Sequence, residues 1–382
     1  MSKNRLKILV LVVSLAVILL TPGLAACTTT TEPPQEMEID GFRILLSDPE
    51  VHFPDFISFA ITAESDSDIS RLSLQYQVDK LSAIPVTSVA FPDFEEGYRV
   101  EATWKWEMRR TGGLPPGTTV SYWWLINDVD GGTAQTPVQT LSFDDLRFSW
   151  KTKESDDIRL LWYEGRDSFA EDLLTAAGQA IERLRTDVGA TLTMPAEIYV
   201  YASYDDLREA MVFPQEWTGG AAYPDYNTIA IGIPLSGLEW GKRAISHEIA
   251  HLVVHQAIFS GYGVELPTWL SEGLAMYSEG TLSPDFNVRL QDAIDQDRVF
   301  SVRSLSSSFP ADEESARLAY AQSYSLVSFL LEEHGGKEKM IQLLDAFKNG
   351  SGYVEALDTV YALDVDQLND EWRAYVGLAA TS

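Results

Sequence analysis

Two histidines, His247 and His251, stand four residues apart, and Glu248 directly follows the first. On an α-helix, residues i and i+4 project from nearly the same face, so both imidazoles would reach one metal ion. Glu248 is turned by about 100° from His247, which places its carboxylate beside a water at the metal. These residues therefore predict a helix that carries a metal site, and the fold around it has to leave that helix face open.

A zinc site that acts on a substrate usually has three protein ligands and one open position. A ligand set that needs Gly at 254 and His at 257 is excluded, because the chain has Val254 and Ala257. Glu272 is the alternative, since it follows His251 after twenty residues and lies about one turn beyond Pro267, a residue that favours a helix start. We therefore expect one zinc ion per chain, bound by His247, His251 and Glu272. On the plainer interpretation, the histidines are ordinary polar residues of an amphipathic helix.

The metal-site residues and their neighbours form two short motifs. They are His247-Glu248-x-x-His251 and Trp269-Leu270-x-Glu272-Gly273-x-Ala275. Together they resemble the gluzincin zinc metallopeptidases, and specifically the peptidase MA-like group often found in bacterial lipoproteins. The resemblance covers about residues 157 to 376. It implies a thermolysin-like catalytic domain, one zinc ion, Glu248 as general base and hydrolysis of peptide bonds.

A second catalytic residue is suggested by the segment Tyr320-Ala321-Gln322-Ser323, which opens a predicted apolar-periodic helix that stops at Gly335-Gly336. In the aminopeptidase branch of the gluzincins, a similar Tyr-x-x-Gly segment supplies a phenol that hydrogen-bonds the oxyanion. Tyr320 matches that tyrosine, whereas Ser323 replaces the glycine. Tyr324 is the alternative donor, and a buried tyrosine with a purely structural role is the other interpretation.

Residues 219 to 233 predict a small hairpin just before the metal-binding helix. In the family, the corresponding edge strand binds an extended substrate backbone, which would make Ala221, Ala222 and Tyr223 substrate-binding residues. An ordinary edge strand without a substrate role is the alternative. The aminopeptidase branch has a glutamate at the position of Tyr223, and that glutamate holds the free N-terminus of the substrate. The departure favours an endopeptidase.

The N-terminus predicts export. Three basic residues precede the 13-residue apolar run Ile8 to Leu20, which is typical of a secretion signal and short for a membrane-spanning helix. Leu24-Ala25-Ala26-Cys27 resembles the bacterial lipobox, which implies cleavage before Cys27 and acylation of its thiol. We expect a signal peptide at 1–26, a flexible tether at 27–36, and an extracytoplasmic protein anchored to the cell membrane by lipids on Cys27.

The charge balance agrees with an exported body. The formal net charge is −29, and removal of residues 1–26, which contain three basic residues and no acids, would leave −32. Such a surface repels nucleic acid and anionic lipid headgroups, so nucleic acid is not an expected partner. Contact with the membrane would then depend on Cys27.

Residues 37–148 and 157–376 differ in pattern, which predicts a multidomain protein. In 37–148, five segments alternate apolar and polar residues between turn signals, as in an immunoglobulin or fibronectin type III β-sandwich. These segments are Ile57–Ala63, Leu72–Val78, Tyr98–Trp106, Val120–Ile126 and Val138–Phe143. Residues 157–376 mix strands and helices and end in a long helical stretch, so an all-β sandwich is followed by an α+β, zincin-type catalytic domain with a helical C-terminal lobe.

Two functions fit these predictions. The first is a membrane-anchored extracytoplasmic zinc metallopeptidase that acts on peptides or proteins as an endopeptidase. The alternative is a non-catalytic zinc-binding surface lipoprotein that binds or adheres through its β-sandwich. The two differ in whether a chelator abolishes cleavage of an unfolded protein and zinc restores it.

Overall fold

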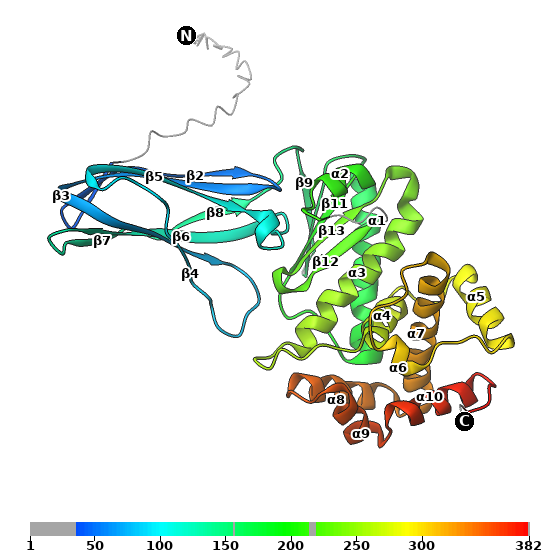
Figure 1. Ribbon diagram of the computed structural model, residues 1–382. Coiled ribbons are helices and arrows are strands. Elements are labelled where there is room, and N and C mark those ends of the chain that lie inside the picture. The colour runs from blue at the N-terminus through cyan, green and yellow to red at the C-terminus, as the bar shows by residue number, and fades with distance from the viewer. Residues whose placement is uncertain (1–35, 156, 214–218, 381–382) are drawn as a thin grey trace, which may run out of the picture.

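The computed structural model describes residues 36–155, 157–213 and 219–380. A β-rich N-terminal domain is followed by a mixed and then a purely helical region (Figure 1). The predicted signal peptide, nearly all of the predicted tether and the predicted lipidation site Cys27 lie outside the described residues. None of the helices in the described ranges has the length and hydropathy needed to cross a membrane.

The β-rich domain is built around one long strand, β3 (Phe56–Val78). Its first half pairs with β2 (Phe42–His52) and β5 (Gly97–Glu107), and its second half pairs with β4 (Ser88–Ala90) and β6 (Thr118–Asp128), always antiparallel. The outer strands are β1 (Met37–Ile39), β7 (Thr133–Gln135) and β8 (Gln139–Phe143), and a short 3-10 helix spans Met108–Arg110. Every second side chain of the first half is buried, which is the period expected of a strand with one face on a core.

The prediction of two separate strands at Ile57–Ala63 and Leu72–Val78 was wrong, because both belong to β3. The polar run between them resembles a turn, but the chain continues and changes partners there, with a register shift between Glu64 and Ile69 against β5. The other three predicted strands coincide with β5, β6 and β8 to within two residues at each end. Immunoglobulin or fibronectin topology stays a prediction for this domain.

A second sheet supports the helix that carries His247 and His251. Its strand order is β12-β13-β11-β10-β9, formed by Gly220–Tyr223, Thr228–Gly232, Ala196–Tyr201, Ile158–Trp162 and Lys151–Glu154. The three inner strands are parallel, and the two edge strands are antiparallel to their neighbours. Helices α1 (Asp167–Arg183) and α3 (Leu238–Ile258) share one apolar core with this sheet. The edge strand β12 lies beside α3 (Figure 1).

The rest of the chain is helical. Its elements are α4 (Thr268–Ser278), α5 (Pro284–Asp295), α6 (Val302–Leu305), α7 (Glu313–Glu333), α8 (Gly336–Lys348), α9 (Tyr353–Tyr361) and α10 (Val365–Tyr375). The predicted start of α7 at Tyr320 was wrong, because Asp312 caps the helix earlier and accepts a hydrogen bond from Ser315 N at 2.9 Å. Tyr320 therefore lies inside α7, where helical geometry fixes its direction.

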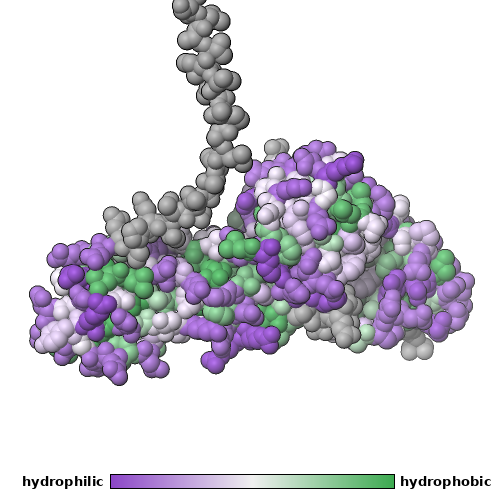
Figure 2. Space-filling model, turned by 90° about the horizontal axis from the view of Figure 1, so that it is seen from above, coloured by the Kyte–Doolittle hydropathy of each residue, from purple (hydrophilic) through white to green (hydrophobic). Residues whose placement is uncertain are grey.

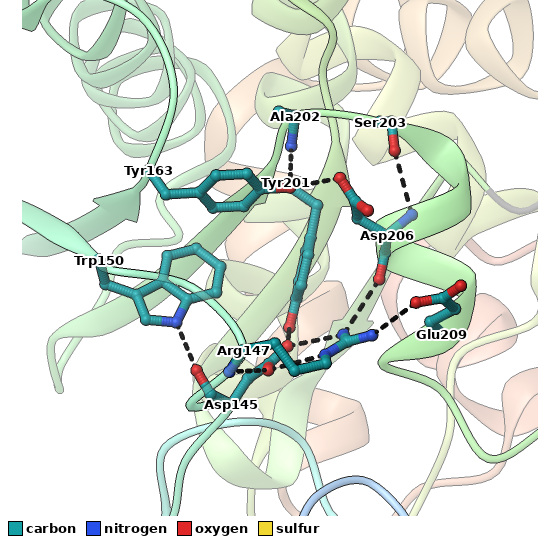
Figure 3. Close-up of polar contacts among 9 residues, drawn as sticks. All are labelled: Asp145, Arg147, Trp150, Tyr163, Tyr201, Ala202, Ser203, Asp206 and Glu209. Carbon is teal, nitrogen blue, oxygen red and sulfur yellow. Dashed lines mark hydrogen bonds and ion pairs between the residues drawn. The ribbon is translucent and has the colours of Figure 1, made fainter.

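A buried polar network joins the two domains (Figure 3). Asp145 follows β8, its side chain is fully buried, and it forms an ion pair with Arg147 at 2.7 Å. Tyr201 of β11 donates a hydrogen bond to the same carboxylate at 3.0 Å, and Trp150 Nε1 donates to the Asp145 carbonyl at 2.7 Å. Arg147 reaches on to Glu209 of α2 (Tyr204–Glu209) at 3.0 Å. A buried carboxylate with all these partners ties the segment between the domains to the second sheet.

Apolar packing strengthens this connection. Phe53 of the β-rich domain packs on the core cluster around Tyr201, and Val212 and Tyr226 of the region after it pack on the core of the β-rich domain. Seen from above, hydrophilic residues cover most of the visible face of both regions, with scattered apolar patches (Figure 2). The two domains are therefore packed together and do not hang on an extended linker.

Candidate active site

Helix α3 places the first two predicted ligands on one open stripe. His247 and His251 are half-buried, and their ring centroids are 5.1 Å apart. The other sides of the helix are held in the core by Ile245, Ile249 and Val253, which are fully buried. Because the apolar residues fix the rotation of α3, both imidazoles point away from the sheet and towards α4.

Glu272 of α4 meets the two histidines. Its Oε2 atom lies 3.2 Å from His247 Nε2 and 3.7 Å from His251 Nε2. One ligand atom from each of the three residues lies within 4.8 Å of the others. In a tetrahedral zinc site, ligand atoms about 2.1 Å from the metal are about 3.4 Å from each other. Two imidazole nitrogens and one carboxylate oxygen at these spacings fit a zinc ion with a fourth position open.

The ligand side chains are coupled through their charges. Burial disfavours the charged form of His247, but hydrogen bonds to Glu272 and Glu279 outweigh it and raise the pKa of His247 to about 10. Burial likewise favours the neutral form of Glu272, but the hydrogen bond from His247 and the positive charges of His251 and His247 together outweigh it and lower the pKa of Glu272. A positive charge among these carboxylates is thus strongly stabilised, and a divalent cation would provide it when the histidines are neutral.

Glu279 is a residue of the candidate site that was not predicted from the sequence. Its Oε1 atom lies 3.0 Å from His247 Nδ1, on the side of the ring away from Glu272, and its side chain is only 14 % exposed. Such a carboxylate fixes the tautomer and the orientation of a ligating imidazole. Glu279 follows Glu272 by seven residues, about two helical turns, so both carboxylates face α3. That spacing indicates the helix face on which Glu279 lies, but it does not identify His247 as the partner.

The residue after Glu272 controls how closely α7 approaches α4. A Cβ atom at Gly273 would lie 2.5 Å from the Ser323 carbonyl oxygen and 2.6 Å from Val327 Cγ2, so a larger residue would push the helices apart. This close packing brings Tyr320 next to His247, with 6.0 Å between ring centroids. The glycine of the second motif therefore has a packing role.

The two candidate tyrosines have different surroundings. Burial, together with the negative charges of Glu272 and Glu248, raises the pKa of Tyr320, so its phenol remains a hydrogen-bond donor. Tyr324 lies instead beside Tyr277, with 6.2 Å between ring centroids. The geometry thus brings Tyr320, and not Tyr324, to the predicted ligands.

The edge strand β12 passes directly beside Glu248. A Cβ atom at Gly220 would lie only 3.2 Å from Glu248 Oε1, so this glycine leaves room for the carboxylate. Among the predicted substrate-binding residues, Ala222 lines the cavity next to Glu248, whereas Ala221 and Tyr223 do not line it. Burial and the charge of Glu248 raise the pKa of Tyr223 to about 12.

Two hollows meet at Glu248, one on each side of the ligand group. The His255 hollow, of about 670 Å³, extends along the C-terminal half of α3 and includes His251, Glu272 and Asp225. The Arg243 hollow, of about 920 Å³, extends along the N-terminal half and includes His247, Glu279 and Tyr320. The ligand group therefore lies in the middle of a long cleft.

The β-rich domain also reaches this cleft. Leu81 N, in the β3–β4 connection, donates a hydrogen bond to the Asp225 carbonyl at 2.6 Å. Lys80 Nζ lies 3.9 Å from the Asp225 carboxylate, which His255 Nε2 also approaches to 3.2 Å. The rim of the His255 hollow is thus held by both domains.

The family model of the peptidase MA superfamily matches residues 176–378, which is more than half of the chain. The chain belongs to the peptidase MA superfamily. The matched region contains both motifs, all three candidate ligands, Glu248, Glu279 and Tyr320. The resemblance to this group of peptidases is therefore confirmed.

Solved structures are similar to this peptidase MA member only at low sequence identity and low TM-score. Legionella pneumophila aminopeptidase A, in complex with aspartic acid, is 11 % identical at a TM-score of 0.36, with 90 % of this chain and 50 % of that chain covered. An M1 zinc metallopeptidase from Deinococcus radiodurans is 12 % identical at a TM-score of 0.31, with 89 % and 93 % covered. The chain thus spans about half the length of the Legionella protein. A comparison with curated proteins found no match.

Replacement of Glu279 tests its contact with His247. We expect Glu279→Gln to weaken zinc binding by about 10- to 100-fold, because an amide holds the ring nitrogen less strongly than a carboxylate. Competition with a chelating dye measures the affinity. Glu265→Gln is the control, since Glu265 is an exposed carboxylate that lines the same cleft. Equal zinc affinity of Glu279→Gln and wild type would show that the contact does not support the metal.

Proposed function

We propose that this peptidase MA member is a zinc-dependent endopeptidase. The observation that carries the proposal is the convergence of His247, His251 and Glu272 at the spacing of a tetrahedral zinc site, beside Glu248. The cleft continues on both sides of this group. Membership in the superfamily supports peptides as the substrate class.

Each side chain of the site would have a separate role in hydrolysis of the peptide bond. A zinc ion, when bound, supplies a Lewis acid that lowers the pKa of water and polarises a carbonyl group. Glu248 takes the proton of the attacking water and passes a proton to the leaving nitrogen. Tyr320 donates its phenol hydrogen to the carbonyl oxygen as negative charge develops there. The open edge of β12 holds the substrate backbone in an extended form.

The shape of the cleft supports an endopeptidase. An aminopeptidase needs a closed end with a group that binds the free N-terminus of its substrate. Here both hollows open from Glu248, and Tyr223 stands where the aminopeptidase branch has its glutamate. A chain could therefore extend through the cleft in both directions.

Replacement of the general base tests the reaction. We expect Glu248→Gln to retain zinc and to lose about 10²- to 10⁴-fold in kcat on unfolded casein and on peptides with an acetylated N-terminus. Activity of the wild type should disappear with a chelator and return with zinc. Proteolysis is followed by mass spectrometry, and metal content by elemental analysis.

Each result has a distinct meaning. Normal turnover by Glu248→Gln would refute its role, and cleavage only of peptides with a free N-terminus would refute an endopeptidase. Glu272→Ala is the companion variant, and it should lose both zinc and activity. Zinc binding without cleavage of any peptide would instead favour a binding lipoprotein.

Matched variants of the two tyrosines of α7 test which of them donates a hydrogen bond to the oxyanion. We expect Tyr320→Phe to lower kcat by about 10²- to 10³-fold, as loss of one donor to a developing oxyanion typically does. Tyr324→Phe should leave kcat nearly unchanged, because its ring lies beside Tyr277 and away from the ligands. Steady-state kinetics on a zinc-loaded sample decide between them. The reverse result would transfer the role to Tyr324.

We further propose that the enzyme works outside the cytoplasm, held to the cell membrane by lipids on Cys27. The lipobox-like segment and the single cysteine support this proposal. Two or more acyl chains anchor a protein stably, whereas a single chain does not. The acidic surface would not itself bind anionic headgroups.

Exchange of the cysteine tests the anchor. We expect the full chain to fractionate with membranes when expressed in a bacterium, and Cys27→Ser to lose the lipid mass on intact-protein mass spectrometry. The variant should also leave the membrane fraction after cleavage of its signal. An unmodified Cys27 in membrane-bound wild type would contradict the proposal.

A further inference from the structure

The two hollows of the cleft differ in charge. Among the described residues that line them, every lysine and arginine belongs to the Arg243 hollow. These cations are Arg183, Lys242, Arg243 and Arg317. In a chain with 57 acidic and 28 basic residues, such a group next to the ligands is unlike the average surface.

Two of the four cations are already paired. Lys242 Nζ lies 2.8 Å from Glu239, and Arg317 lies 2.9 Å from Glu313 and 3.3 Å from Asp285. These pairs leave little net positive charge. The other two, Arg183 and Arg243, therefore determine the net charge of the hollow.

Arg183 and Arg243 have no carboxylate within ion-pair distance among the described residues. Arg243 donates to the Thr281 carbonyl at 3.0 Å, and Arg183 donates to the Ser278 carbonyl. A guanidinium has five N–H donors, so most of the donors of both side chains remain available. Of the three acids that line the hollow, Glu239 is paired with Lys242 and Glu279 contacts His247, while Glu248 is the proposed general base.

Arg243 stands next to the reaction centre. It precedes His247 by four residues on α3, so it projects on nearly the same stripe of the helix, about 6 Å along the axis. One residue of an extended peptide advances about 3.3 Å. A substrate side chain one or two residues from the scissile bond would therefore reach the guanidinium.

The direction of the substrate follows from β12. Gly219, just before β12, lies against Trp240 of the Arg243 hollow, and Pro224 and Asp225, just after it, line the His255 hollow. A peptide that pairs antiparallel with β12 runs from the His255 hollow to the Arg243 hollow. Antiparallel pairing is the more stable arrangement. The Arg243 hollow thus receives residues that follow the scissile bond.

We infer that the enzyme selects polypeptides with an acidic side chain at the first or second position after the scissile bond. Arg243, supported by Arg183, binds this carboxylate. Arg–carboxylate bonds are charge-assisted and often bidentate, which gives both strength and geometry. The inference rests on the proposed function, since it names the substrate class of that cleft.

Matched peptides test the inference. They carry acetylated N-termini and amidated C-termini and differ only in Glu, Gln or Lys at each of the two positions. We expect kcat/KM for the best Glu peptide to exceed that for its Gln partner by about tenfold, as one charge-assisted bond would give. The Lys peptide should be the slowest. A Glu peptide that is no better than Gln at either position would overturn the inference.

Variants separate recognition from support of the fold. Arg243→Gln should bring the ratio of kcat/KM for the Glu peptide to that for the Gln peptide to about one, and Arg243→Lys should keep part of the preference. Arg298→Gln, an exposed arginine that lines neither hollow, is the control. If Arg243 only anchors the Thr281 carbonyl, all peptides will slow by the same factor, and that result would also refute the inference.

Binding distinguishes this inference from the proposed function. Fluorescently labelled Glu and Gln peptides are titrated into zinc-loaded Glu248→Gln protein, and anisotropy measures each Kd. A lower Kd for the Glu peptide than for the Gln peptide supports the inference even if wild type cleaves neither peptide. Equal Kd values, together with normal cleavage by wild type, overturn the inference and leave the proposed function unaffected. Because the hollow is open to solvent, the preference should decrease as salt is added.

Discussion

The contact between α4 and α7 at Gly273 is the constraint on which the site depends. With the Ser323 carbonyl oxygen 2.5 Å from the place of a Cβ atom, the backbones of the two helices pack directly against each other. The α4 helix then faces α3 with Glu272 and Glu279, while α7 presents Tyr320 beside His247. A single residue without a side chain therefore lets three helices meet around one centre, and none of them holds the complete set of groups.

Local periodicity explains what could be predicted from the sequence. Helical spacing alone places His247 and His251 on one stripe, and the turn signals before Pro267 allow a second helix to return with Glu272. Glu279 was missed because its role depends on the angle between α3 and α4, which neither helix encodes by itself. The start of α7 was misjudged because its cap, Asp312, lies before the apolar period begins.

Contacts between distant segments explain what could not be predicted. The polar run inside β3 has the composition of a turn, and only the pairing with β5 and β6 shows that the strand continues. Asp145 and Tyr201 are 56 residues apart, yet their hydrogen bond helps to fix the β-rich domain against the second sheet. That placement brings Leu81 to Asp225 at the rim of the cleft. The sequence pattern predicts two domains but does not show that both of them contribute to the rim of the cleft.

The loop after α4 links metal support to substrate charge. Arg183 and Arg243 donate to the carbonyls of Ser278 and Thr281, and between these residues lies Glu279, which contacts His247. The same two guanidiniums thus stabilise the end of α4 and face the Arg243 hollow. The two Arg–carbonyl hydrogen bonds and the contact of Glu279 with His247 therefore lie within one segment, residues 278 to 281, so the same short loop positions both the cations of the hollow and the second contact of His247.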